Sequence, residues 1–229
     1  MKIITIAGAP SSGKTSVVFH TVKHFLAEEK RVSAVKFDAL STHDDKIYIK
    51  KLKIPALCGI SDYVCPDHYY VSNLEEVFLW GVEKQTEVLF IETAGLCFRC
   101  APHIKEVPAI TVVDNLSGSD APAKMGPALF FADVVVITKG DLVSQAEREV
   151  FKYRVQKVNS RATIFHLNGL SGKGSVLLRR LIDEWPETGT LAEKSLRYSM
   201  PASICSYCTG ETRIGQEYQS GNVKKIKVT

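Results

Sequence analysis

A glycine-rich segment near the N-terminus has the residue types and the spacing of a phosphate-binding loop. It runs from Gly8 to Thr15 with the sequence GAPSSGKT, which satisfies the full Walker A pattern. Its terminal glycines allow the backbone to curl, so that successive N–H groups and the following helix N-terminus face the phosphates. We expect Lys14 to reach the β and γ phosphates and the Thr15 hydroxyl to bind magnesium. The nucleotide-binding residues predicted within the loop are Gly8, Ala9, Ser11, Ser12, Gly13, Lys14 and Thr15.

A second candidate for chemistry is an acidic residue at the end of an apolar strand. Glu92 follows the four apolar residues 88–91 and precedes Thr93, Ala94 and Gly95. In nucleotide hydrolases a carboxylate in this position engages magnesium, directly or through water, or positions the attacking water. We therefore predict a catalytic and metal-binding role for Glu92 and expect the Gly95 N–H to sense the γ phosphate. The alternative is a solvated strand terminus.

A third segment is typical of guanine recognition. Thr138, Lys139, Gly140 and Asp141 resemble the Asn/Thr-Lys-x-Asp motif of GTPases. A carboxylate at Asp141 would accept hydrogen bonds from the N1–H and the exocyclic amine of guanine, whereas adenine offers no such pair of donors. Lys139 would lay its aliphatic stem along the base. The segment predicts GTP as the nucleotide, the alternative being an ordinary charged loop between a strand and a helix.

Four of the six cysteines form two Cys-x-x-Cys pairs, Cys97 with Cys100 and Cys205 with Cys208. A two-residue spacer lets both thiolates converge on one metal, and two pairs together complete a tetrahedral zinc site or hold a [4Fe-4S] cluster. The first pair follows Gly95 closely, so we expect metal state and nucleotide state to be coupled. The alternative is that these are buried cysteines that pack in the core.

The rest of the chain supplies the elements that must position these residues. Alternating strands and helices predict an α/β fold, a mainly parallel sheet flanked by helices as in P-loop NTPases. We predict a GTPase domain over residues 1–190 and a small C-terminal module with the two cysteines of a metal knuckle over residues 195–229. The expected strands cover residues 2–7, 31–37, 87–92, 109–113, 132–138 and 162–167. The expected helices cover residues 14–29, 73–84, 144–157 and 175–184.

Composition narrows the class of protein. The 229 residues carry a net charge of +4 with no long run of either sign, an excess too small to indicate nucleic acid as a partner. No apolar run approaches the roughly 20 residues that span a bilayer, and the N-terminal apolar stretch is shorter than a signal-peptide core. We therefore expect a cytoplasmic protein without a membrane partner, in which paired cysteines indicate metal or redox chemistry.

Together these motifs resemble the nickel-insertion GTPases that mature hydrogenase and urease, within the dimeric branch of P-loop GTPases. The resemblance covers about residues 1–185. It rests on the loop from Gly8 to Ser16, which adds Ser16 to the expected nucleotide-binding residues, and on the turn from Ile91 to Gly95. The most specific matches are residues 112–114, 118–120, 124–127 and 132–141.

The resemblance implies a nucleotide-dependent homodimer that delivers a metal to an apo-metalloenzyme client, with slow hydrolysis acting as a timing switch. It also implies that Asp38 is a switch residue near magnesium and that Asp45 lies in the same switch, although Asp38 is equally explained as a polar strand end. Urease-type members carry Cys-Pro-His in their metal site. This chain has one residue more in Cys65-Pro66-Asp67-His68, so Cys65 and His68 are implied as metal ligands whose geometry is altered. A His-rich metal-storage segment is missing from the sequence, which leaves metals other than nickel open as the cargo.

Three functions compete on these observations. The first is a magnesium-dependent GTPase that serves as a metallochaperone or maturation factor. The second is an ATP-dependent redox activator whose cysteine-ligated iron–sulfur cluster passes an electron as the nucleotide is cleaved, and Asp141 argues against it. The third is a small-molecule kinase, which has no use for the segment from Thr138 to Asp141 or for paired cysteines.

Overall fold

The computed structural model describes residues 1–40, 42, 44–95, 103–199, 210–221 and 223–228. The strands are β1 (Lys2–Gly8), β2 (Val32–Asp38), β3 (Ala56–Ile60), β4 (Val88–Glu92), β5 (Ala109–Asp114), β6 (Val134–Thr138) and β7 (Thr163–His166). The α-helices are α1 (Lys14–Leu26), α2 (Asp44–Ile47), α3 (Pro66–Val71), α4 (Leu74–Glu83), α5 (Ala121–Lys124), α6 (Pro127–Phe130), α7 (Gln145–Val158) and α8 (Ser175–Glu184). Shorter turns are the π-helix η1 (Tyr48–Leu52) and the 3₁₀ turns η2 (Asn115–Ser117), η3 (Gly140–Leu142) and η5 (Gln216–Tyr218).

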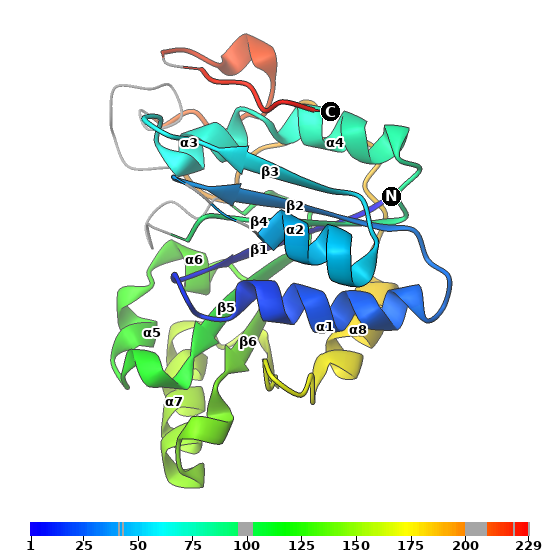
Figure 1. Cartoon of the computed structure of the whole chain (residues 1–229). Helices are drawn as coiled ribbons and strands as arrows, with labels where there is room; N and C mark the ends of the chain where they lie inside the picture. Colours follow the sequence, from blue (N-terminus) through cyan, green and yellow to red (C-terminus); the bar gives the residue numbers. More distant parts are fainter. Residues whose placement is uncertain (41, 43, 96–102, 200–209, 222, 229) are drawn as a thin grey trace.

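The strands form one sheet of seven in the order β3-β2-β4-β1-β5-β6-β7, and every pairing is parallel. Helices lie above and below the sheet (Figure 1). Because all strands run the same way, their carboxyl ends meet at one edge, which is where ligands bind in open α/β sheets. The ends of β1, β2, β4 and β6 carry the segments for which the sequence predicts chemistry.

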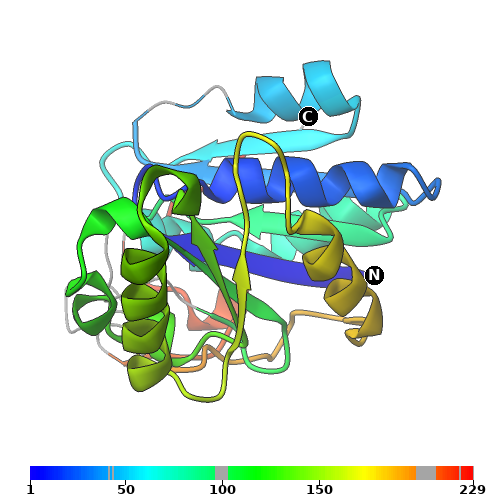
Figure 2. The same ribbon diagram turned by 90° about the horizontal axis from the view of Figure 1, so that it is seen from below.

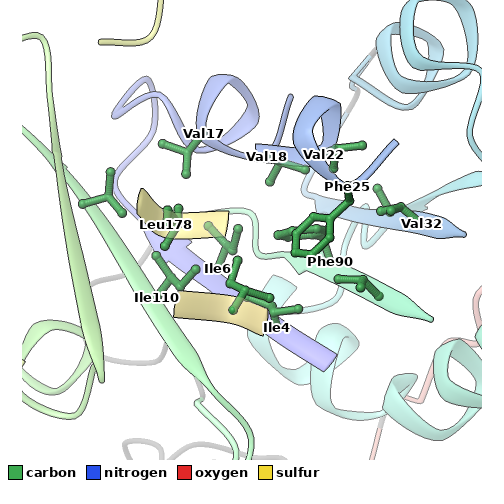
Figure 3. Packing of buried hydrophobic residues seen from close by; sticks show 14 of the residues in the cluster. Ile4, Ile6, Val17, Val18, Val22, Phe25, Val32, Phe90, Ile110 and Leu178 are labelled. Carbon is green, nitrogen blue, oxygen red and sulfur yellow. The ribbon is translucent and has the colours of Figure 1, made fainter. Parts of the chain in front are cut away.

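One face of the sheet is covered by α1, with α8 lying beside α1 (Figure 2). Alternate residues of the strands point to this face, including Ile4 and Ile6 of β1 and Phe90 of β4, and they pack against Val17 and Phe25 of α1 (Figure 3). All five side chains are at most 1% exposed. Fully buried β-branched and aromatic runs are typical of a parallel sheet covered on both faces.

The opposite face is covered by α3 and α4 together with residues of the C-terminal segment. Leu196, Ile214 and Ile226 lie in the same buried cluster as Phe37 of β2 and Leu74 of α4. Short antiparallel bridges hold this segment in place, one joining Ile104 to Leu196. The division of the chain into residues 1–190 and 195–229 stays a prediction.

The predicted α/β fold is confirmed, because a parallel sheet flanked by helices is what the structure contains. All six expected strands and all four expected helices are present, and α8 has the predicted bounds. Strand β3 was not predicted. It has five residues, lies at an edge of the sheet and contains Cys58 and Gly59, and glycine weakens the strand signal. In the part of the chain that the structure describes, every helix is too short or too polar to cross a membrane.

Candidate functional site

The phosphate loop connects β1 to α1, and its glycines are required by the local backbone. Gly8 lies so close to β5 that a Cβ there would be 2.2 Å from the Val112 carbonyl oxygen. Gly13 caps α1 with a φ of 96°, in the left-handed region that glycine adopts without strain. The loop therefore delivers its N–H groups to the start of a 13-residue helix, where the helix dipole favours an anion.

Lys14 lies inside this loop. Its ammonium group donates to the carbonyl oxygens of Gly8 at 3.0 Å and of Ala9 at 2.9 Å, and the residue is 4% exposed. Gly95 closes the loop from the other side, because a Cβ on it would lie 2.1 Å from the Gly8 carbonyl oxygen and 2.6 Å from Lys14 Nζ. The backbone that follows β4 is thus in direct contact with the phosphate loop, where the sequence places a γ-phosphate sensor.

Glu92 ends β4 beneath the first turn of α1 and is 1% exposed, so it is not a solvated strand end. The Thr15 hydroxyl donates to both of its carboxylate oxygens, at 3.0 Å to Oε1 and 3.3 Å to Oε2. The Tyr48 hydroxyl of η1 donates to Oε2 at 3.0 Å. Lys36 of β2 forms an ion pair with Oε1. The carboxylate and the hydroxyl predicted to serve magnesium are therefore neighbours.

The two aspartates that the family resemblance implies lie at the end of β2 and in α2. Asp38 ends β2, two residues beyond the position where Lys36 faces Glu92 in the strand register. It is half-buried, and its Oδ1 accepts a hydrogen bond from the Ala39 N–H at 2.8 Å. Asp45 is in α2, the helix that precedes η1. A role for Asp38 at magnesium stays a prediction.

The segment predicted to recognise the base also contacts the phosphate loop. The Thr138 hydroxyl donates to the Ser12 carbonyl oxygen at 2.6 Å, which ties the end of β6 to the loop. Lys139 has a φ of 54° and its ammonium lies 3.4 Å from Asp114 Oδ1. Asp141 is exposed. Together they border a cleft of about 310 Å³ that is lined by Ser11, Gly13, Ser16, Thr138, Lys139, Asp141, Leu142, Gly169 and Leu170.

The last two lining residues belong to a loop that the sequence did not single out. The loop follows β7, and the Asn168 side chain shapes it by accepting hydrogen bonds from the N–H groups of Leu170 at 2.9 Å and Ser171 at 2.8 Å. His20 of α1 contacts the Gly169 carbonyl oxygen at 3.0 Å. A glycine-rich stretch after a predicted parallel strand was the available signal, because every such strand ends at the same edge.

Lys36 and Tyr48 are the other residues near the site that sequence reasoning missed. Lys36 is 5% exposed and Tyr48 is 1% exposed. The signal for Lys36 was a lysine inside an otherwise apolar strand. Tyr48 gave no comparable signal, since an aromatic residue between lysines is common on protein surfaces.

The predicted cysteine site cannot be placed, because Cys97, Cys100, Cys205 and Cys208 all lie outside the described residues. Cys65 caps the N-terminus of α3 and is exposed, whereas His68 is 2% exposed and burial lowers the pKa of its imidazole. Within the described ranges, no cluster of three or more histidine, cysteine, aspartate or glutamate side chains could hold a metal ion.

Residues 2–166 match the family model described as CobW/HypB/UreG, nucleotide-binding domain. The chain belongs to this family. It is 46% identical over 226 residues to the uncharacterized protein MJ0120 of Methanocaldococcus jannaschii, which covers 99% of this chain and 96% of that protein. It is 26% identical over 172 residues to the urease accessory protein UreG of Aliarcobacter butzleri, covering 69% of this chain and 84% of UreG.

The fold also agrees with a solved structure of the CobW/HypB/UreG type. HypB from Helicobacter pylori, crystallised in complex with nickel, has a TM-score of 0.63 at 17% identity, covering 83% of this chain and 91% of that chain. At this identity the likeness shows the fold alone. The resemblance drawn from the motifs is thus confirmed, and the contacts around Lys14 and Glu92 belong to a nucleotide-binding domain.

Proposed function

We propose that the chain is a magnesium-dependent GTPase that acts as a metallochaperone or maturation factor for a metal- or cluster-containing enzyme. The observation that carries the proposal is the cleft of about 310 Å³, which Lys139 and Asp141 line together with residues of the phosphate loop. A nucleotide whose phosphates lie on Gly13 and Ser16 would present its base to Asp141. Guanine offers the two donors that a carboxylate accepts there.

Each residue of the site has a separate role in nucleotide binding and hydrolysis. Backbone N–H groups of the loop and Lys14 hold the β and γ phosphates, and the ammonium exchanges its two carbonyl partners for phosphate oxygens. The oxygen donors of Thr15, Glu92 and Asp38 suit magnesium, which prefers hard oxygen ligands and would neutralise charge on the phosphates. Glu92 orients water, and the Gly95 N–H contacts the γ phosphate.

The cargo is proposed from the relatives and the cysteines. UreG is named as a urease accessory protein and the HypB structure contains nickel. In this chain we propose that Cys97, Cys100, Cys205 and Cys208 bind zinc or an iron–sulfur cluster, or carry another transition metal to the client. The residues from Cys65 to His68 are a second candidate, at the start of α3. We further propose that the protein works as a nucleotide-dependent homodimer.

The nucleotide assignment is tested by exchanging hydrogen-bond polarity at Asp141. Calorimetric titration of the wild-type protein with GTP, ATP and XTP should show a clear preference for GTP. Asp141→Asn should lose that preference and gain affinity for XTP, because xanthine replaces the exocyclic amine with a carbonyl that an amide can donate to. Asp183→Asn on α8 is the matched control and should keep the wild-type preference. Equal affinity of the wild type for GTP and ATP would favour the ATP-dependent redox activator.

The metal assignment is tested by elemental analysis and absorption spectroscopy of anaerobically purified protein. A zinc site is colourless, whereas an iron–sulfur cluster absorbs in the visible and bleaches on reduction. Metal content per chain should fall in the double variant Cys205→Ser, Cys208→Ser. If it is unchanged, the two cysteine pairs do not share one site.

A further inference from the structure

The carboxylate proposed to serve magnesium is already engaged by a cation from the protein itself. Lys36 and Glu92 face each other across β2 and β4 in the strand register. They continue the rows of residues 32, 34 and 88, 90 that point to the α1 face, so both side chains lie under the phosphate loop. The ion pair is buried, with the two side chains 6% and 2% exposed.

The surroundings of Glu92 leave little room for a further donor or a metal. Oε1 accepts from Lys36 and Thr15, and Oε2 accepts from Tyr48 and Thr15. A carboxylate has about four lone-pair positions, and three donors occupy most of them: Lys36, Tyr48 and the single Thr15 hydroxyl, whose proton is shared between the two oxygens. A magnesium ion, or a water that it holds, therefore competes with these donors for the Glu92 carboxylate.

Charge decides which donor withdraws. A unit positive charge in hydrogen-bond contact with the carboxylate opposes a divalent cation at the same place, and burial strengthens this opposition because the site is poorly screened. Thr15 and Tyr48 are neutral donors, and the Thr15 oxygen can hold magnesium while its O–H still donates to Glu92. The repulsion therefore falls on Lys36.

We propose that Lys36 is a tethered cation that competes with magnesium for Glu92 and is displaced when the magnesium–nucleotide complex binds. This inference rests on the proposed magnesium-dependent nucleotide site and deepens it, because it assigns a residue that weakens magnesium binding. Lys36 is a positioning residue in this scheme. It holds Glu92 on Thr15 in the nucleotide-free protein and moves away in the loaded one.

Displacement of Lys36 would act on the end of β2 and on η1, because both elements contact or adjoin the Glu92 carboxylate. Lys36 lies two residues before Asp38 at the end of β2, and Tyr48 of η1 contacts the same carboxylate. The exchange of one cation for another thus takes place at a carboxylate that β2 contacts through Lys36 and η1 contacts through Tyr48, the two elements on either side of α2. In this way magnesium binding at the phosphate loop is coupled to the conformation of α2 and η1.

The experiment measures the magnesium dependence of nucleotide affinity, using GDP and a non-hydrolysable GTP analogue titrated calorimetrically over a series of free magnesium concentrations. Lys36→Met removes the charge and keeps the chain length, so the magnesium concentration at half-maximal effect should fall by roughly tenfold or more. Lys36→Arg keeps the charge and should keep the wild-type midpoint. Tyr48→Phe removes a neutral donor from the same carboxylate and should shift the midpoint much less than Lys36→Met.

The outcomes separate this inference from the proposed function. A midpoint in Lys36→Met that equals the wild-type value, or lies above it, overturns the competition. Failure of the wild type to bind either guanine nucleotide at any magnesium concentration overturns the proposed function itself. Thermal unfolding in the presence of a chelator reports whether each variant folds. If Lys36→Met does not, Lys36→Gln gives the same test, because its neutral amide still donates to Glu92.

Discussion

The buried histidine His103 should contribute about 2 kcal/mol to the loss of stability in mild acid. The residue is 1% exposed, its Nε2 lies 3.1 Å from the Ala128 carbonyl oxygen, and its Nδ1 lies 3.4 Å from the Thr5 hydroxyl. Burial, followed by the positive charge of Arg197, lowers the pKa of the imidazole from 6.5 to about 4. The ring is therefore neutral in the folded protein and donates from Nε2 to the Ala128 carbonyl.

The sign and size of the change in the free energy of unfolding follow from the difference between the pKa of His103 in the folded and unfolded states. An unfolded chain protonates His103 near pH 6.5, whereas the folded chain resists protonation until about pH 4. The contribution is fully present above pH 6.5 and is lost as the pH falls toward 4, at about 1.4 kcal/mol per pH unit. Between pH 7 and pH 5 the free energy of unfolding should fall by about 2 kcal/mol on this account.

Urea unfolding at pH 7 and pH 5 measures this loss in the wild type and in His103→Gln, whose amide can still donate but does not titrate. The wild type should lose about 2 kcal/mol more than the variant between the two pH values. His68 and His166 also have lowered pKa values, but they titrate in both proteins and cancel in the comparison. Equal losses in wild type and variant would refute the assignment to His103.

Three further substitutions test other contacts. Gly95→Ala should abolish tight triphosphate binding, because its Cβ would lie 2.1 Å from the Gly8 carbonyl oxygen and 2.6 Å from Lys14 Nζ and would displace the phosphate loop. Nucleotide titration measures the affinity and circular dichroism reports whether the variant folds. Wild-type affinity in the variant would contradict the prediction. Glu92→Gln should bind GTP but hydrolyse it roughly tenfold more slowly or worse, as measured by phosphate release. A wild-type rate of hydrolysis in this variant would show that Glu92 takes no part in the reaction. Asn73→Ala removes the acceptor of the Ile226 N–H and should lower the free energy of unfolding by about 2 kcal/mol in urea titrations; an unchanged midpoint would show that this contact is dispensable.

The parts of the site that were predictable are those encoded in short contiguous strings. The loop ending at Lys14 needs specific backbone conformations in consecutive residues, so its sequence pattern survives without knowledge of the fold. Glu92 was predictable for a related reason, since a carboxylate directly after four apolar residues marks a strand end. In both cases local sequence and tertiary position are tied together.

The contacts that were not predicted are created by tertiary structure. Lys36 and Glu92 are 56 residues apart in sequence, and only the pairing of β2 with β4 brings them together. Tyr48 reaches the same carboxylate because η1 packs against α1, and this packing has no local signature. Strand β3 was not predicted because a short edge strand with a glycine lacks the apolar run of its buried neighbours.

The packing of the C-terminal segment has a consequence for the order in which the molecule is completed during synthesis. The apolar face formed by α3 and α4 receives four of its buried side chains from Leu191, Leu196, Ile214 and Ile226. A ribosome releases these residues after the phosphate loop, the sheet and all of the long helices have emerged. Until then the nascent chain exposes an uncovered apolar surface, the kind of surface that chaperones bind and that drives aggregation. Expression of a chain cut at residue 190 would keep the molecule in that incomplete state.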